Sequence, residues 1–229
     1  MSGKKPSRAP APKRSILVVD DHPMMRQGLS QLINNEPDLT VCCEAGTAEQ
    51  ALEFVTKSKP DLVLADISLP GKSGLELIKD LQALEPELPV LVISMHDESL
   101  YAERVLRAGA RGYIMKQEGG KKLMQAIRQV LGGQVYVSEK MSAKILEIFS
   151  GRRPQSSSPV GNLTDREFEV FQLIGQGRST RDIAQQLHLS VKTVEVHRVN
   201  IKSKLKLATA TELIRYAVRW VELQGSDQG

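Results

Sequence analysis

Short apolar runs alternate with amphipathic stretches over the first two-thirds of the chain. The stretches between the runs repeat apolar residues at helical spacing, as Met25, Leu29 and Ile33 do in the first of them. Strands that are apolar on both faces and alternate with helices indicate a parallel sheet covered on both sides. We therefore predict a doubly wound α/β domain over residues 15–135. Its five expected parallel strands are Ser15–Asp20, Leu39–Ala45, Leu62–Asp66, Val90–Ser94 and Gly112–Lys116.

The end of the chain shows only helical patterns. Thr164 and Glu167 form a capping-box pair at the start of one helix, and Ser179 and Ser190 are suitable caps for two more. A short helix, a turn and a longer helix over Val191–Lys204 are typical of a helix-turn-helix. With a last helix over Thr211–Leu223, the pattern predicts a small all-α, four-helix domain over residues 163–229.

Residues 136–162 lie between these two domains. The apolar spacing within Ser138–Phe149 predicts one more helix, and Gly151–Gly161 contains two prolines, three serines and no periodicity. We expect this second segment to be a flexible linker, long enough to let the C-terminal domain dock on the first domain or leave it. Residues 1–14 are basic and proline-rich, and we expect a disordered tail there.

Composition narrows the class of protein. The chain has 229 residues, of which 41% are hydrophobic and 25% charged, as in packed globular proteins. It has no apolar run of membrane-spanning length, no secretory signal pattern, and only two cysteines, the adjacent Cys42 and Cys43. We therefore expect a cytoplasmic protein with no disulfide framework, no zinc cage and no membrane partner.

The charges are unevenly distributed along the chain. The net charge is +4, but residues 15–135 carry 12 basic and 17 acidic side chains, whereas residues 163–222 carry ten basic and seven acidic ones. This asymmetry indicates two domains with different partners rather than one domain with a uniform surface. The basic C-terminal domain is the candidate for nucleic-acid binding.

Chemically active residues follow the expected strands of the first domain. Because the carboxyl ends of parallel strands meet at one edge of a sheet, these residues are expected to lie together. Carboxylates without cysteine or histidine ligands favour Mg²⁺, and Mg²⁺ neutralises phosphate oxygens during phosphoryl transfer. The residues are Asp20 and Asp21 after the first strand, Asp66 after the third, Ser94 in the fourth and Lys116 after the fifth.

This set resembles the receiver domain of bacterial two-component response regulators, which has a flavodoxin-like fold, over about residues 15–131. The resemblance implies that Asp66 accepts a phosphoryl group from a sensor histidine kinase. It implies Mg²⁺ ligation by Asp21, Asp66 and the backbone carbonyl of Ser68, with Asp20 acting through water. Lys116 and Ser94 would contact the phosphoryl group, and Tyr113 would move inward as the switch residue. Gln117 stands where many receivers have proline.

The second helix of the expected helix-turn-helix is strongly basic. Residues 190–206 carry five basic side chains and one acidic one, and the outer face of this helix is the expected DNA surface. Glu195, Val196 and Val199 are our candidates for reading base edges. Other expected DNA contacts, mostly to the backbone, are Lys192, Thr193, His197, Arg198, Lys202 and Lys204.

The span Leu163–Leu207 resembles the LuxR-type helix-turn-helix, and the whole chain resembles response regulators of the NarL/FixJ class. The resemblance implies a non-enzymatic transcriptional regulator that binds promoter half-sites as a homodimer, with RNA polymerase as a further candidate partner. The matching residues are Leu163-Thr164, Arg166-Glu167, Gly177, Ile183-Ala184, Leu187, Leu189-Ser190, Thr193-Val194, His197, Ile201 and Lys204-Leu205.

Several alternatives remain beside this interpretation. A free-standing phosphotransferase or phosphatase would use the acidic site without the basic domain, and an orphan regulator would bind DNA without phosphorylation. Gly71-Lys72-Ser73 imitates the end of a P-loop, but Asp66 stands where the first glycine of that motif belongs. We interpret His22 as a helix-start residue rather than a metal ligand.

The opposite charges of the domains predict that docking hides Val191–Lys204 from DNA.

Overall fold

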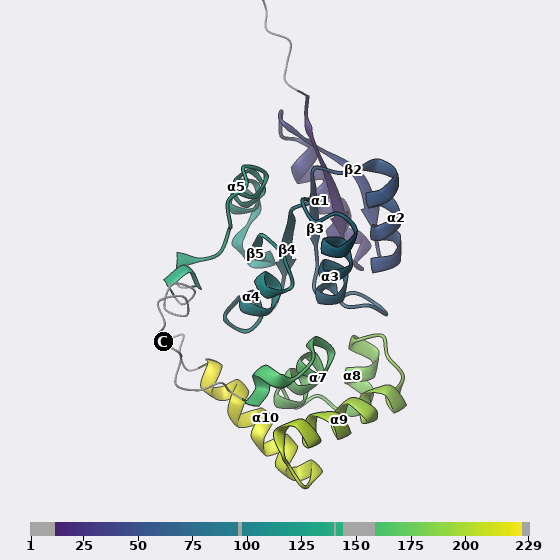
Figure 1. Ribbon diagram of the computed structural model, residues 1–229, viewed down its shortest axis with the longest axis vertical. Coiled ribbons are helices and arrows are strands. Elements are labelled where there is room, and N and C mark those ends of the chain that lie inside the picture. The colour runs from purple at the N-terminus through teal and green to yellow at the C-terminus, as the bar shows by residue number, and fades with distance from the viewer. Residues whose placement is uncertain (1–11, 96–97, 140, 144–158, 226–229) are drawn as a thin grey trace, which may run out of the picture.

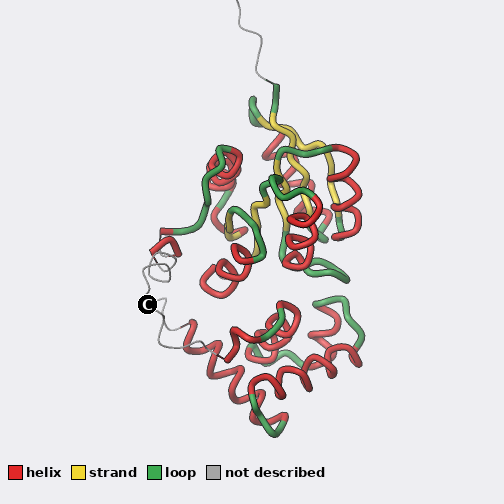
Figure 2. The backbone as a smooth tube through the Cα atoms, in the orientation of Figure 1, coloured by secondary structure: helices red, strands yellow, loops and turns green. Residues whose placement is uncertain are grey.

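The computed structural model describes residues 12–95, 98–139, 141–143 and 159–225. Residues 1–11 of the expected tail, the later part of the expected helix Ser138–Phe149 and the start of the expected linker lie outside these ranges. The described residues form an α/β domain followed by a bundle of helices (Figures 1 and 2). Within those residues, no helix combines the length and apolar character needed to span a bilayer.

The first domain contains a five-stranded, all-parallel sheet in the order β2-β1-β3-β4-β5, as the sequence predicts. Its helices cover both faces. The strands are β1 (Arg14–Val19), β2 (Leu39–Ala45), β3 (Leu62–Ala65), β4 (Val90–Ser94) and β5 (Gly112–Met115). The helices are α1 (Pro23–Asn34), α2 (Ala48–Ser58), α3 (Gly74–Leu84), α4 (Glu98–Arg107) and α5 (Gly120–Leu131), with a 3-10 turn η1 (Lys116–Glu118) after β5.

Successive side chains of a strand point to opposite faces of the sheet, and each face has its own hydrophobic core. Ile16 and Val18 of β1 pack with α1 and α5, whereas Leu17 and Val19 pack with α2, α3 and α4. All four side chains are fully buried. At about 25 cal/mol per Å² of buried apolar surface, this two-sided burial is the main force that holds the sheet between its helices. It also fixes the register that brings the strand ends together.

Both edges of the sheet depart from regular pairing. On β2, Ile16 of β1 pairs with Val41 and Leu17 pairs with Cys43, so Cys42 is an unpaired extra residue, a β-bulge. The Cys42 thiol donates to the Ile16 carbonyl at 3.5 Å. On the β5 edge, Tyr136 forms a parallel bridge with Gly112, and its carbonyl accepts from the Tyr113 amide at 2.9 Å.

The second domain consists of α7 (Asp165–Gly175), α8 (Thr180–Gln186), α9 (Val191–Leu205) and α10 (Ala210–Gly225). Capping boxes begin α7 at Thr164 and α8 at Ser179, and Ser190 caps α9 through the Thr193 amide. Pro159–Asn162 forms a 3-10 turn, η2, in which Val160 is buried. This end of the expected linker is therefore packed, contrary to our expectation of a flexible segment.

The two domains share a continuous apolar core. Buried residues of α3 and α4 and buried residues of α7 belong to one cluster. Phe168 of α7 packs edge-on against Tyr101 of α4, with ring centroids 5.3 Å apart, and against Trp220 of α10 at 5.6 Å. The contact places α7 and α8 between the sheet and α9 (Figure 1).

Candidate functional site

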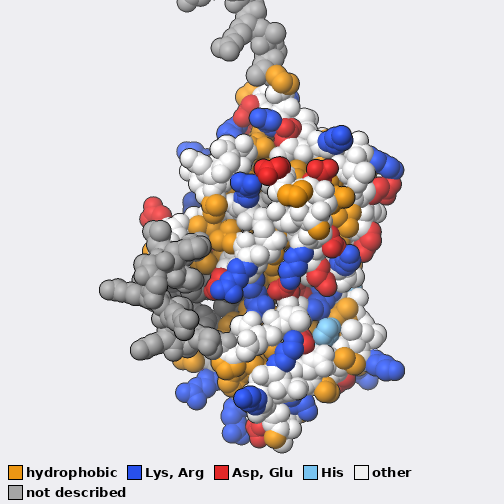
Figure 3. Space-filling model, viewed as in Figure 1, with side chains coloured by type: hydrophobic (Ala, Val, Ile, Leu, Met, Phe, Trp, Pro, Cys, Tyr) orange, Lys and Arg blue, Asp and Glu red, His pale blue; other side chains and the backbone are white. Residues whose placement is uncertain are grey.

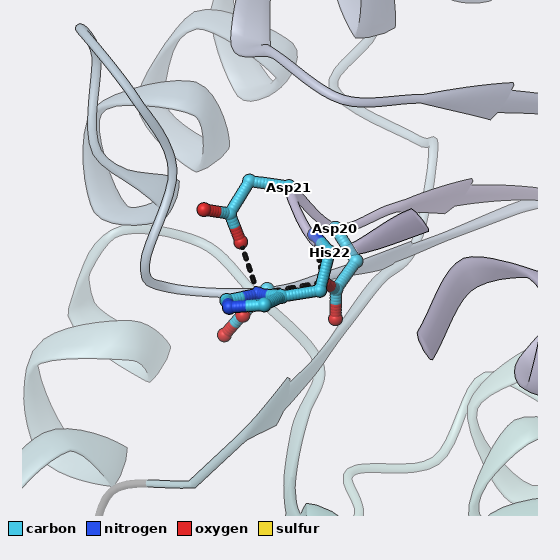
Figure 4. Close-up of side chains that lie close together, drawn as sticks. Asp20, Asp21 and His22 are labelled. Carbon is cyan, nitrogen blue, oxygen red and sulfur yellow. Dashed lines mark hydrogen bonds and ion pairs between the residues drawn. The ribbon is translucent and has the colours of Figure 1, made fainter. Parts of the chain in front are cut away.

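The carboxylates that follow β1 and β3 lie together at the carboxyl edge of the sheet. Backbone pairing places them there, because the Asp66 amide donates to the Val19 carbonyl at 2.8 Å. Ligand atoms of Asp20, Asp21, His22 and Asp66 all lie within 4.8 Å of one another. Figure 4 shows how Asp20, Asp21 and His22 lie together. Asp20 and Asp66 are buried, at 0% and 3% exposure. Three carboxylates at such separations repel one another unless a cation offsets their charge.

Lys116 supplies one such cation. It follows β5, and its Nζ lies 2.6 Å from Asp20 Oδ2 and 2.7 Å from Asp66 Oδ2. Burial alone would lower the pKa of Lys116, but the carboxylates of Asp66 and Asp20 raise it instead, so the ammonium stays charged. Burial raises the pKa of Asp66 to about 6, against the opposing effect of Lys116. The acidic site thus has a fixed positive group beside its central carboxylate.

The cluster fits a hard divalent cation. Asp21 Oδ1 is buried and has no hydrogen-bond donor among the described residues, although His22 Nδ1 lies 2.6 Å from it in a geometry unsuited to a hydrogen bond. A buried carboxylate oxygen without a donor is costly, and a metal ion would satisfy it. The Ser68 amide donates to Asp66 Oδ1 at 3.3 Å, which holds the backbone next to the expected third ligand.

His22 sits where we expected it, at the N-cap of α1. Its amide donates to Asp20 Oδ1 at 2.8 Å, and its side chain is 70% exposed. The backbone around Gly71-Lys72-Ser73 also does not form a P-loop. Ser73 caps α3 in a capping box with Glu76, and Lys72 pairs with Asp80 at 2.6 Å.

Ser94 and Tyr113 lie on neighbouring strands. Ser94 ends β4 and is fully buried, and Tyr113 pairs with Val92 within the β4–β5 ladder. Tyr113 is only 1% exposed, so its ring lies in the interior of the receiver.

The helix-turn-helix forms a surface with two unequal faces. Val194, Ile201 and Leu205 of α9 face the core, as predicted. Val196 and Val199 point outward and are 52% and 58% exposed. Lys192 and Glu195 are exposed on the same helix, and Glu195 Oε1 accepts from the Thr180 hydroxyl of α8 at 3.0 Å. Lys and Arg side chains are spread over the C-terminal domain in Figure 3.

Three residues expected on the outer face of α9 are turned inward or engaged within the domain. His197 is half-buried, and burial lowers its pKa, so the ring is neutral. Lys204 Nζ lies 2.6 Å from the carboxylate of Glu167, and the Arg198 side chain is only 14% exposed. Exposed Asn200 of α9 and Arg181 of α8 were missed by the sequence-based selection. Asn200 lies one position after Val199, so a helical wheel centred on the two valines would have included it.

The expected masking of α9 by the first domain is wrong. α9 lies on the far side of α7 and α8 from the sheet, and its two outward valines remain exposed while the domains are docked. The docking contacts come instead from α7, from the turn before α9, where His188 Nε2 lies 3.5 Å from Asp21 Oδ2, and from η2.

Known protein families match both halves of the chain. The family model described as "Response regulator receiver domain" matches residues 16–128, and the one described as "Bacterial regulatory proteins, luxR family" matches residues 161–217. The oxygen regulatory protein NreC of Staphylococcus haemolyticus is 35% identical over 209 residues, which cover 89% of this chain and 96% of NreC.

Solved structures share the fold. A LuxR-family two-component response regulator from Aurantimonas sp. SI85-9A1 is 33% identical with a TM-score of 0.56, over 60% of this chain and 99% of that one. RcsB of Salmonella enterica serovar Typhimurium, bound to promoter rprA with BeF3-, is 23% identical with a TM-score of 0.60, over 90% and 98% of the two chains. The chain therefore belongs to the two-component response regulators that join a receiver domain to a luxR-family DNA-binding domain.

Proposed function

We propose that this response regulator is a transcription factor controlled by phosphorylation of Asp66. The observation that carries the proposal is the set of contacts around Asp66. A buried carboxylate touches the Lys116 ammonium and lies beside an Asp21 oxygen without a hydrogen-bond donor among the described residues, in the same chain as an exposed helix-turn-helix. A purely structural role seldom requires a buried carboxylate, a contacting ammonium and a carboxylate oxygen without a donor at one sheet edge.

In the proposed reaction, an Asp66 carboxylate oxygen attacks the phosphorus of a phosphohistidine on a sensor kinase or of a small phosphodonor. The O–P bond forms as the bond from phosphorus to the donor nitrogen or oxygen breaks, which leaves an acyl phosphate on Asp66. Asp21, Asp66 and the Ser68 carbonyl are the candidate ligands of Mg²⁺, which would offset phosphoryl charge when bound. Asp20 supports this ion through water.

Two side chains would then hold the new phosphoryl group. Lys116 already lies within 2.7 Å of Asp66 and would transfer its contact to a phosphoryl oxygen. Ser94, at the end of β4, would donate its hydroxyl to another. This rearrangement would be transmitted through Tyr113 and through α4, which follows β4 in the chain.

The DNA surface is the outward face of α9. Val196, Val199 and Glu195 would contact base edges, and Lys192, Thr193 and Lys202 would contact the backbone. His197, Arg198 and Lys204 instead face or bind their own domain. One small domain makes few phosphate contacts, so we expect a homodimer on paired half-sites. Such a regulator would act in the cytoplasm and recruit or block RNA polymerase.

Phosphoryl labelling tests the proposal. With acetyl phosphate and Mg²⁺, the protein should gain a single phosphoryl group by intact mass, and chelation of the metal should prevent the gain. Asp66→Asn should not be labelled, whereas Asp61→Asn, which changes a carboxylate at the opposite edge of the sheet, should be. Labelling of Asp66→Asn at the wild-type level would contradict the assignment.

One observation favours a second candidate, a regulator that binds DNA without phosphorylation. The outward face of α9 is exposed while the two domains are docked. Equal DNA affinity of Asp66→Asn and of the phosphorylated wild type, at one salt concentration, would support this second function over the first.

A further inference from the structure

The outward face of α9 carries a single acidic side chain. Glu195 is the only acidic residue among residues 190–206, and its side chain is 56% exposed. A carboxylate on a surface that meets phosphates weakens binding to every DNA sequence, because like charges repel. On this surface it points to a base contact that offsets the repulsion. The exposed residues beside it on the same face are Lys192, Val196, Val199, Asn200 and Ser203.

The Glu195 carboxylate is held in place from the neighbouring helix α8, which lies beside α9 in Figure 1. The Thr180 hydroxyl donates to Glu195 Oε1 at 3.0 Å. Thr180 is the first residue of α8, and the capping box of that helix is made by Ser179 and Asp182, so the cap does not use the Thr180 hydroxyl. A contact between two helices thus restrains a side chain that would otherwise sample several rotamers, before DNA binds.

The second carboxylate oxygen of Glu195 is left open as an acceptor. Oε2 lies 3.9 Å from Arg198 Nε, which is longer than a hydrogen bond. The Arg198 side chain is only 14% exposed, so its charge lies beside the carboxylate while the carboxylate itself faces outward. Glu195 therefore presents one free acceptor oxygen, and no donor, on the outward face of α9.

A base with an unopposed donor in the major groove matches this arrangement. Cytosine presents its 4-amino group there, whereas guanine presents two acceptors and thymine presents an acceptor and a methyl group. Adenine has an amino donor, but its N7 acceptor lies next to that donor and repels a carboxylate. The chemistry of a carboxylate therefore favours cytosine over the other three bases.

We propose that Glu195 selects a cytosine in each half-site and that Thr180 is the positioning residue that aims its carboxylate, an inference that rests on the proposed function. The Thr180 hydroxyl occupies Oε1, and the cytosine amino group donates to Oε2. Because the carboxylate is already restrained, little side-chain entropy is lost when this hydrogen bond forms.

Three variants of the full chain separate the parts of this inference. Glu195→Gln replaces the acceptor oxygen pair by an amide, which both accepts and donates and so matches the amino group and N7 of adenine. Thr180→Val removes the hydroxyl at nearly constant shape, and Thr180→Ser is its matched control because it keeps the hydroxyl. Glu53→Gln, on the exposed face of α2, is the control for a change of acid to amide elsewhere.

Selection of bound duplexes from a randomised DNA library gives the preferred site of each protein. Each selection is made with and without acetyl phosphate and Mg²⁺, so that base reading is measured separately from phosphorylation. The affinities for the selected site, for its single-base variants and for unrelated DNA are then measured at one salt concentration.

We expect the wild type to prefer cytosine over adenine by about tenfold at one position of the half-site. Glu195→Gln should prefer adenine at that position alone, and it should bind unrelated DNA more tightly because an acidic charge is lost. Thr180→Val should weaken the preference for cytosine without reversing it, whereas Thr180→Ser and Glu53→Gln should match the wild type.

Two results would overturn the inference. Identical base preferences of Glu195→Gln and the wild type at every position would show that Glu195 reads no base. Full discrimination by Thr180→Val would show that Thr180 does not position the carboxylate. Failure of the wild type to select any sequence, with or without acetyl phosphate, would instead contradict the proposed function.

Discussion

The guanidinium of Arg104 lies 4.2 Å from the centroid of the Phe168 ring, across the boundary between the receiver and the DNA-binding domain. The same side chain donates to two carbonyls and pairs with Asp165 at 3.3 Å. Only the planar fork of arginine can stack on a ring and bind several oxygens at once. Arg104 therefore joins α4, the helix that follows β4, to η2, to Leu163 and to α7 of the second domain.

Arg104→Lys should loosen the domain contact. Lysine keeps the charge but loses the stacking and at least one buried hydrogen bond, at a cost of about 1–3 kcal/mol. Small-angle scattering should show a larger radius of gyration, and Trp220 emission should move to longer wavelength. The control is Arg107→Lys, because the Arg107 side chain is 74% exposed and pairs only with Glu103 of its own helix among the described residues. An unchanged radius in Arg104→Lys would show that the apolar core alone holds the domains.

Domain docking should weaken as the pH rises. Glu169 of α7 is buried, and burial raises its pKa to about 7, with Glu76 of α3 and Asp165 adding to the rise and Arg166 opposing it. In an opened protein, Glu169 is freed from Glu76 and its pKa falls toward the ordinary glutamate range. Protonation of Glu169 thus favours docking. This contribution is fully present at low pH and is lost as the pH rises through about 7.

Trp220 emission across pH 5 to 9 measures this effect. Glu169→Gln, which mimics the protonated form, should show a flatter profile than the wild type. The difference between the two profiles isolates the effect of Glu169 from that of other groups. Coincident profiles would contradict the role of Glu169.

Gly74→Ala should damage the phosphorylation site without touching its side chains. A Cβ on Gly74 would lie 2.2 Å from the Asp66 carbonyl oxygen and 2.6 Å from Ile67 Cα, so the backbone that carries Asp66 must shift. We expect a loss of about 1–3 kcal/mol in unfolding free energy and slower labelling of Asp66. Gly28→Ala is the control, because its Cβ meets nothing within 4 Å and should stabilise α1 by about 0.5–1 kcal/mol. Wild-type labelling of Gly74→Ala would mean that the loop yields easily.

Substitutions on α9 should separate phosphate contacts from base contacts. Lys202→Ala should weaken binding to all DNA sequences similarly and reduce the salt slope by about one, because one phosphate contact is lost. Val199→Ala should instead change preference at individual base pairs by about 1–3 kcal/mol. Lys57→Ala on α2 is the control for charge alone. A uniform loss of affinity from both α9 variants would contradict the choice of Val199 as a reading residue.

The receiver fold and the clustering of Asp20, Asp21, Asp66 and Lys116 were predictable, because each of these residues follows a strand that is apolar on both faces. Ile16 to Val19 fix the end of β1, and with it the position of Asp20 and Asp21. The orientation of α9 was less predictable, since Val196 and Val199 are apolar yet exposed, whereas His197 is polar yet half-buried. Helical periodicity alone does not resolve such a helix.

The contacts between the domains could not be read from the sequence. They depend on residues far apart in the chain, such as Tyr101 and Gln172, and on carbonyl groups, which carry no sequence signal. Net charge predicted attraction between the domains, but not which face of the second domain would meet the receiver. The contact combines buried apolar residues with hydrogen bonds and ion pairs.

The irregular sheet edges limit how two copies of this protein can associate. An open edge strand is a template for another strand, and pairing of edges is a route to aggregation. Here the bulge at Cys42 interrupts the regular series of backbone amide and carbonyl groups along β2. On β5, Tyr136 already pairs with part of that series. Neither edge offers a long uninterrupted ladder to a neighbour. A second copy that pairs with this domain would therefore have to use a surface other than these two edges.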